Sequence, residues 1–320
     1  MANIALLNRC NLKCPYCFAN DYTESKGADI DADTFLELLD FVAPDREVGL
    51  IGGEPLLHEK IDTFLEILDN DYRFRAVTLF TNGIYIDKHI DYLKSPNLII
   101  LINVNSKEQI GKLFDKVDNG IELLINQGMK NSITLGINIY KENQDFSDIL
   151  YLAKKYGIKK IRVSVVIPQD KSEGGINYFY RMKNTLLSLC RELKEIGACP
   201  YYDCNAIPEC VYTDEEKEFI YSLPFNSEYE REIFMGKRSV CSPVIDIYPD
   251  KTATRCFGCY DNKVKIEDFK SISDLRNYFF MQIDSRLVHS YSRKECKDCY
   301  KHKTFGCFGG CLCYKKNDIQ

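Results

Sequence analysis

The stretch IALLNRCNLKCPYCF, residues 4–18, joins a short apolar run to three cysteines, Cys10, Cys14 and Cys17. The apolar residues predict a buried β-strand, and the cysteines follow where that strand ends. In parallel α/β folds, the loops at the carboxyl ends of the strands carry the active site. We therefore expect the three thiols to share one loop at a functional site.

Similar apolar runs recur along the first 170 residues and alternate with amphipathic segments. The six runs are IALLN (4–8), VGLIGG (48–53), AVTLFTNG (76–83), LIILINVN (98–105), ITLGINIY (133–140) and IRVSVVIP (161–168). The helix-like segments are 31–43, 61–71, 106–117, 146–157 and 178–197. Strands that alternate with helices predict an α/β fold around a parallel sheet. Periodicity alone does not distinguish an open doubly wound sheet from an incomplete barrel.

The composition limits the partners and the location of the protein. The chain has 320 residues and a formal net charge of -5, so it has no bulk attraction to nucleic acid or to an anionic membrane. It has no apolar run of 18 residues and no secretory signal at its start, so we expect a cytoplasmic protein. Fifteen cysteines in such a chain are expected to bind metal rather than to form disulfides.

The first three cysteines suit an iron-sulfur cluster better than a zinc site. Three thiolates on a short loop can hold three corners of an iron-sulfur cube and leave one iron open to a reactant. A zinc site needs a fourth ligand, and the only histidines of this region, His58 and His89, have no second candidate ligand beside them. The alternative is a set of unrelated buried cysteines.

Two motifs resemble those of a known family. The pattern Cys-x3-Cys-x2-Cys, with Tyr16 before the third cysteine, is similar to the signature of the radical S-adenosylmethionine enzymes, and GGEP (52–55) resembles their second motif. The resemblance covers residues 3–170 and implies a partial (β/α)6 TIM barrel. It also implies a 4Fe-4S cluster on Cys10, Cys14 and Cys17. The open iron of that cluster chelates S-adenosylmethionine, and one electron then cleaves this cofactor to methionine and a 5'-deoxyadenosyl radical.

The resemblance also implies the contacts to S-adenosylmethionine. Gly52 and Gly53 let the backbone approach a ligand closely, while Glu54 helps to fix their loop. Thr81, Asn82 and Gly83 form either a simple turn or a substrate contact. The complete set of residues expected at the cofactor is Tyr16, Gly52, Gly53, Glu54, Asn103, Asn105 and Asn138. No residue stands out as a general base or radical relay.

A second group of cysteines lies near the end of the chain. The run CKDCYKHKTFGCFGGCLC (296–313) resembles the SPASM extension of the same superfamily, whose auxiliary 4Fe-4S clusters accompany peptide-modifying members. The resemblance implies a first auxiliary cluster on Cys241, Cys256, Cys311 and Cys259, and a second on Cys296, Cys299, Cys307 and Cys313. A one-cluster, twitch-type arrangement stays open, and so does zinc, because paired Cys-x2-Cys units are also zinc-ribbon spacings.

The remaining cysteines follow no motif. Cys190 falls in a helical stretch and is expected to be a buried apolar residue. Cys199, Cys204 and Cys210 lie in or beside a segment expected to be irregular, 199–210. We interpret these three as structural, although one of them could complete a cluster or meet substrate.

These patterns predict three parts: a radical SAM barrel at 1–198, a connector at 199–235 that contains an acidic helix at 214–221, and a small Cys-rich α+β domain at 236–320. In the last part we expect a hairpin over 244–256 and a helix over 271–284.

The leading functional hypothesis is an enzyme that abstracts hydrogen from a peptide or protein, which leads to a crosslink, an epimerised residue or an oxidised residue. Its expected partners are that peptide, an electron donor such as flavodoxin or ferredoxin, and a separate leader-binding protein. One alternative is radical chemistry on a small molecule or cofactor precursor. Another is a non-catalytic iron-sulfur scaffold or electron carrier.

Overall fold

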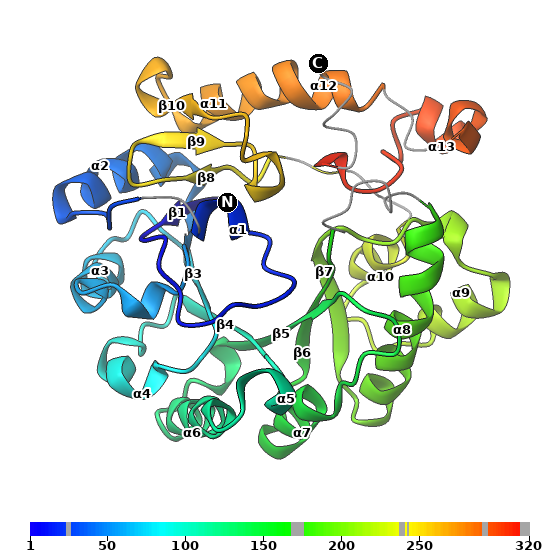
Figure 1. The fold of residues 1–320 in the computed structure, drawn as a ribbon, viewed down its shortest axis with the longest axis horizontal. Coiled ribbons are helices and arrows are strands. Elements are labelled where there is room, and N and C mark those ends of the chain that lie inside the picture. The colour runs from blue at the N-terminus through cyan, green and yellow to red at the C-terminus, as the bar shows by residue number, and fades with distance from the viewer. Residues whose placement is uncertain (24–26, 168–175, 237–240, 242, 290–293, 314–320) are drawn as a thin grey trace. The chain divides into compact units, whose positions relative to one another are not determined.

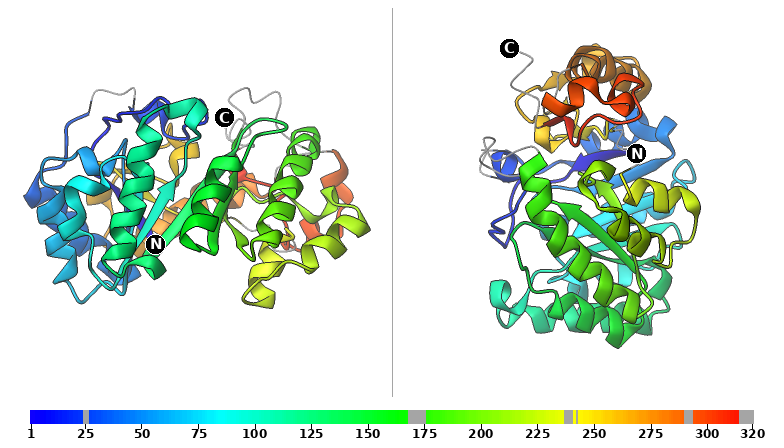
Figure 2. Two further views of the ribbon diagram at one scale, coloured as in Figure 1. Left: turned by 90° about the horizontal axis from the view of Figure 1, so that it is seen from below. Right: turned by 90° about the vertical axis from the view of Figure 1, so that its right-hand side faces the viewer.

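The computed structural model describes residues 1–23, 27–167, 176–236, 241, 243–289 and 294–313. The chain forms two compact units, Met1–Thr134 with Pro243–Phe279, and Leu135–Ser242 with Phe280–Gln320. Strands and helices alternate along most of the chain (Figures 1 and 2). The strands are β1 (Ala2–Ala5), β2 (Glu47–Ile51), β3 (Ala76–Thr81), β4 (Leu98–Asn103), β5 (Ile133–Ile139), β6 (Lys160–Val165), β7 (Cys199–Cys204), β8 (Asp246–Ile247), β9 (Thr252–Thr254) and β10 (Val264–Lys265).

The helices follow the amphipathic segments of the sequence. In α2, for example, the Asp31 side chain accepts a hydrogen bond from the Thr34 N–H at 2.7 Å, and Phe35, Leu38 and Leu39 are buried on one face. The helices are α1 (Asn20–Thr23), α2 (Ala32–Val42), α3 (Ile61–Asp69), α4 (Ile86–His89), α5 (Lys107–Ile110), α6 (Leu113–Asn126), α7 (Ser147–Tyr156), α8 (Ile176–Glu195), α9 (Asp214–Tyr221), α10 (Glu228–Phe234), α11 (Ile272–Phe279), α12 (Ser285–Leu287) and α13 (Tyr300–Lys303).

The first unit holds a sheet in the order β10-β9-β8-β1-β2-β3-β4. Strands β1 to β4 are parallel, and β8 adds to β1 in parallel, with Asn3 opposite Asp246. β9 is antiparallel to both β8 and β10, and the β8–β9 pair is the hairpin that the sequence predicted. In the second unit β5, β6 and β7 are parallel, and all seven residues of β5 are buried.

The predicted six strands are present, each with bounds within three residues of those expected. Pro168, the last residue expected in the sixth strand, lies outside the described residues. The α/β fold of a partial (β/α)6 barrel is confirmed by this strand and helix order, and the C-terminal part is Cys-rich as expected. The expected domain boundaries at 198 and 235 stay a prediction.

Two local predictions are wrong. The segment 106–117 is not one helix, because Gly111 adopts φ 55° and ends α5 after one turn, before α6 begins. The segment 199–210 is not irregular throughout, because residues 199–204 form β7 and pair in parallel with β6 across a bulge at Val163 and Ser164. An exposed edge can recruit even a strand that contains proline.

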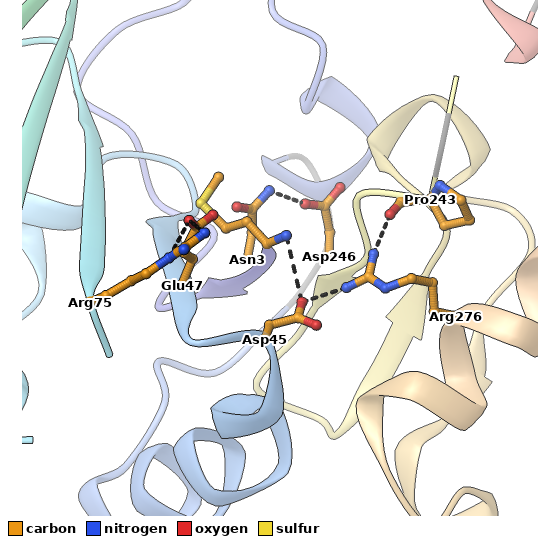
Figure 3. A network of polar contacts seen from close by, with 8 residues as sticks. Asn3, Asp45, Glu47, Arg75, Pro243, Asp246 and Arg276 are labelled. Atoms are coloured by element: carbon orange, nitrogen blue, oxygen red, sulfur yellow. Dashed lines mark hydrogen bonds and ion pairs between the residues drawn. The ribbon is translucent and has the colours of Figure 1, made fainter. Parts of the chain in front are cut away.

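A polar network joins the segment Pro243–Phe279 to the rest of the first unit (Figure 3). Arg276 on α11 forms an ion pair with Asp45 and donates to the Pro243 carbonyl. Asn3 Nδ2 donates to Asp246 Oδ1 at 2.7 Å, which joins β1 to β8. The Asp246 carboxyl is buried, and this burial raises its pKa to about 7. Arg75 and Glu47 form a more exposed pair nearby.

We expect Arg276→Ala to lower the free energy of unfolding by about 1–3 kcal/mol. The mostly buried Asp45 carboxylate would lose its ion pair with Arg276, and the Pro243 carbonyl would lose a charged donor. The matched control is Arg75→Ala, whose guanidinium side chain is 67% exposed and whose loss should change stability by less than about 0.5 kcal/mol. Urea titration of both variants measures the difference. Equal effects would contradict the anchoring role.

A second expectation concerns pH. The pKa of Asp246 is about 7 in the folded protein and close to its ordinary value of 3.8 in the unfolded chain, so its contribution to stability is lost as the pH rises between about 4 and 7. At most, about 4 kcal/mol follows from such a shift. Asp246→Asn should remove this slope in the metal-free protein, whereas Asp274→Asn, on the exposed side of α11, should keep it. Unfolding free energies at pH 5 and pH 8 measure both slopes, and a slope unchanged by Asp246→Asn would refute the assignment.

Candidate functional site

The three N-terminal cysteines share one loop after β1, as predicted. The Cys17 N–H donates to the Cys14 carbonyl at 3.1 Å, and the Leu12 N–H donates to Cys10 Sγ at 3.5 Å. Burial, with smaller contributions from neighbouring charges that include Cys17, raises the pKa of Cys10 to about 11 and that of Cys14 to about 12. A bound cation would favour the ionised form of thiols that are buried in this way.

The loop is fixed from β4 by Asn105. Both Cys14 Sγ, at 3.2 Å, and the Tyr16 hydroxyl donate to Asn105 Oδ1, and Asn105 Nδ2 donates to the Asn103 carbonyl at 3.3 Å. Asn105 and Tyr16 are buried. The polar groups of Asn105 are thus engaged in holding the cysteine loop, which the sequence pattern alone did not indicate.

Gly52 and Gly53 bring the GGEP loop against the start of the cysteine loop. The Gly53 N–H donates to the Leu7 carbonyl and the Glu54 N–H to the Arg9 carbonyl, both at 2.9 Å. A Cβ on Gly53 would lie 2.0 Å from the Arg9 carbonyl oxygen, and Gly52 has φ 146°. The close approach that these glycines permit is therefore to the chain itself.

Glu54 is a buried carboxylate with three hydrogen bonds. Oε1 accepts from Thr81 Oγ1 at 2.7 Å and from the Leu56 N–H at 3.1 Å, and Oε2 accepts from the Asn82 N–H at 2.8 Å. Burial raises the pKa of Glu54, while these three bonds lower it. Asn82 Nδ2 in turn donates to Asn11 Oδ1 at 2.8 Å. The carboxylate therefore joins the end of β3 to the GGEP loop, and Asn82 extends the link to the cysteine loop.

The two remaining asparagines of the expected cofactor set differ in their surroundings. Asn103, at the end of β4, has a buried Oδ1 that accepts no hydrogen bond from the part of the chain that the structure describes. Asn138, on β5 in the second unit, accepts from Arg162 Nη1 at 2.9 Å and is buried. Arg162 is a functional candidate that the sequence did not suggest, because an arginine in an apolar strand carries no motif.

The C-terminal cysteines fall in both units. In the first unit, Cys256 and Cys259 flank a short turn after β9, and their sulfur atoms lie within 4.8 Å of each other. The fully buried Arg255 donates to Cys256 Sγ at 3.8 Å. In the second unit, Cys296, Cys311 and Cys313 are buried, and Cys241, Cys299 and Cys307 are partly buried. Cys190 is fully buried, which confirms its interpretation as an apolar residue.

An aromatic cluster connects two of these segments within the first unit. Tyr22, just after the cysteine loop, packs against Tyr248 and Phe257 with ring centroids 4.9 and 5.9 Å apart, and Phe18 packs against Phe257 at 5.1 Å. Cys17 lies against the same cluster. The cysteine loop and the turn of Cys256 and Cys259 thus share one packed wall.

The fold and the thiol loop define a class of α/β protein that carries three cysteines on the loop after its first strand. The sequence model of the radical SAM superfamily matches residues 4–173. The chain therefore belongs to the radical SAM superfamily, whose members hold a 4Fe-4S cluster and S-adenosylmethionine. Within the described residues, no helix is long and apolar enough to cross a membrane.

Curated relatives match about half of the chain. A probable GTP 3',8-cyclase of Methanococcus vannielii is 27% identical over 179 residues, which are 52% of this chain and 59% of that protein. A GTP 3',8-cyclase of Synechocystis is 26% identical over 166 residues, 48% of this chain and 50% of that protein. The chain thus spans about half the length of these curated relatives.

A solved structure matches almost the whole chain. Streptococcus suis SuiB superposes with a TM-score of 0.61 at 15% identity, over 98% of this chain and 71% of that chain. SuiB bound to its precursor peptide SuiA gives a TM-score of 0.54 at 16% identity, over 98% and 70% of the two chains. At these identities the likeness shows a shared fold.

We expect Gly53→Ala to displace the cysteine loop, because its new Cβ would collide with the Arg9 carbonyl. Stability should fall by about 1–3 kcal/mol, and the iron bound through Cys10, Cys14 and Cys17 should be lost. Gly27→Ala is the matched control, since its Cβ would meet Asn8 Nδ2 at an ordinary 3.4 Å. Thermal unfolding and iron content after anaerobic reconstitution measure the effects. Full iron content in Gly53→Ala would show that the close approach is not needed.

Proposed function

We propose that this protein reductively cleaves S-adenosylmethionine and abstracts hydrogen from a peptide or protein substrate. The observation that carries the peptide assignment is the extent of the fold match. The likeness to SuiB, which has been solved with a precursor peptide, spans 98% of the chain and so includes the Cys-rich C-terminal part. The match to the GTP 3',8-cyclases covers only about half of the chain.

The residues of the first unit fit the cofactors that this function needs. Cys10, Cys14 and Cys17 would hold the 4Fe-4S cluster, which when bound supplies the electron that cleaves S-adenosylmethionine. The unpartnered Asn103 Oδ1 is an acceptor that a cofactor amino or hydroxyl group would satisfy. Gly52, Gly53 and Glu54 would hold the loop on which the cofactor rests. Tyr16 and Asn105 would position Cys14. Asn138, which belongs to the second unit, stays a candidate ribose contact.

The C-terminal cysteines would hold one or two auxiliary 4Fe-4S clusters. The arrangement expected from the sequence is Cys241, Cys256, Cys259 and Cys311 for the first, and Cys296, Cys299, Cys307 and Cys313 for the second. Such clusters would take up an electron or bind substrate. A cytoplasmic location, with flavodoxin or ferredoxin as electron donor and a separate leader-binding protein, suits this chemistry. We also retain the division into a barrel at 1–198, a connector at 199–235 and an auxiliary domain at 236–320.

A second candidate is radical chemistry on a small molecule. The names of the relatives favour it, because GTP 3',8-cyclases act on a nucleotide. The substrate is therefore the part of the proposal that most needs a direct test.

The test measures 5'-deoxyadenosine after anaerobic reconstitution with iron and sulfide, with dithionite as reductant. We expect peptides encoded beside the gene to stimulate release and to change mass, and GTP to do neither. Cys14→Ala should reduce release to the background rate, whereas Cys204→Ala, an exposed thiol outside the loop, should not. Stimulation by GTP alone would favour the small-molecule function. Intact clusters without any 5'-deoxyadenosine would refute both and favour an electron carrier or scaffold.

A further inference from the structure

Four cysteines of the second unit approach one another, and one of them belongs to no motif. Cys210 lies in the short turn Glu209–Val211, far in sequence from Cys296, Cys299 and Cys307. The Cys307 thiol lies within electrostatic range of Cys210, Cys296 and Cys299.

Main-chain and ion-pair contacts bring the turn that holds Cys210 against the segment that holds Cys307. Glu209, the neighbour of Cys210, forms an ion pair with Lys301 on α13. The carbonyl of the same Lys301 accepts hydrogen bonds from the N–H groups of Gly306, at 2.9 Å, and Cys307, at 3.1 Å. Lys301 thus contacts the turn of Cys210 through its side chain and the segment of Cys307 through its backbone.

Cys296 and Cys299 belong to the same group through a tight turn. The Cys299 N–H donates to the Cys296 carbonyl at 3.2 Å, and Cys299 precedes α13 directly. The Gly309 N–H donates to Cys307 Sγ at 3.2 Å. Backbone N–H groups that point at sulfur stabilise the negative charge of a thiolate or of a metal-bound thiolate.

The turn of Cys210 is held rigidly from the other side. Gly236 has φ 66°, and a Cβ there would lie 2.3 Å from the Ile207 carbonyl oxygen and 2.8 Å from the Glu209 nitrogen. The Lys183 side chain, which is 8% exposed as a residue, donates to the Val211 carbonyl at 3.2 Å and pairs with Glu216 at 2.9 Å. A ligand must be held in this way if it is to be preorganised for a metal.

We infer that Cys210, Cys296, Cys299 and Cys307 form a four-thiolate metal site, in which Cys210 is the ligand that the sequence pattern assigns to Cys313. The inference deepens the proposed function and rests on it only for the metal, which in that setting is a 4Fe-4S cluster rather than zinc. Four thiolates complete the cluster, so this centre has no open iron and cannot bind S-adenosylmethionine in the way that the three-cysteine loop can. A four-thiolate cluster without an open iron can still transfer electrons, and we assign it that role.

The first test uses the wild-type protein and needs no variant. Cys204 and Cys210 are both exposed and lie six residues apart, so they should react alike with iodoacetamide if neither binds metal. In the anaerobically reconstituted protein we expect Cys204 to be alkylated and Cys210 to be protected, as read by peptide mass spectrometry. After acid release of the metal, both should react. Alkylation of Cys210 at the rate of Cys204 in the loaded protein would overturn the inference.

The second test uses variants that lack Cys10, Cys14 and Cys17, so that only the C-terminal centres are loaded. Cys210→Ala should lose about four irons per chain and expose Cys296, Cys299 and Cys307 to alkylation. Cys204→Ala should lose none, and Cys313→Ala should leave these three thiols protected. The reverse pattern for Cys210→Ala and Cys313→Ala would restore Cys313 as the ligand. Elemental analysis identifies the metal, and zinc in place of iron would overturn the cluster assignment.

These outcomes are separate from those of the proposed function. The release of 5'-deoxyadenosine depends on the three-cysteine loop and is measured in protein that retains it. Protection of Cys210 without any such release would refute the proposed function and leave the four-thiolate site standing. Release of 5'-deoxyadenosine with Cys210 freely alkylated would refute the four-thiolate site and leave the proposed function standing.

Discussion

The site of the first unit depends on backbone hydrogen bonds between two loops. Beyond the last paired residues of β1 and β2, the Leu6 N–H donates to the Ile51 carbonyl, and the Gly53 and Glu54 N–H groups donate to the carbonyls of Leu7 and Arg9, all at 2.9 Å. These bonds continue the strand pairing into the loops. Only glycine leaves room for these bonds at positions 52 and 53. The position of the cysteine loop therefore depends on residues at least 35 positions away in the sequence.

The Glu54 carboxylate links the two paired loops to a third loop, the one that follows β3. A buried carboxylate is costly unless its oxygens are satisfied, and Glu54 accepts three hydrogen bonds. Two of the donors belong to the end of β3, and Asn82 there also donates to Asn11. The burial that raises the pKa of Glu54 also makes each of these bonds stronger than it would be in water. The cysteine loop is therefore supported from β2, β3 and, through Asn105, β4.

The sequence was sufficient for features that local patterns encode. Alternating apolar runs predicted the strands, and cysteine spacing predicted the loop, because both signals lie within a few neighbouring residues. Pairing between distant segments left no such pattern. Strand β8 joins β1 across 243 positions, and β7 forms only because β6 offers an edge. Asn105 was expected to contact cofactor, but its amide already binds Cys14 and Tyr16, a use that depends on three-dimensional proximity.

The difference between local patterns and distant contacts also explains why motifs predicted the hairpin of the first unit but not a role for Cys210. Cys256 and Cys259 are three residues apart, and their hairpin is held by ordinary apolar packing of Tyr248 and Phe257 against Tyr22. Because Phe18 and Cys17 lie in the same cluster, neither the cysteine loop nor the hairpin turn can shift without disturbing the packing of the other. Close packing therefore couples two cysteine-bearing segments in this unit, whereas the turn of Cys210 is joined to α13 by the Glu209 and Lys301 ion pair. An ion pair between single residues carries no spacing rule, so only the folded chain reveals that connection.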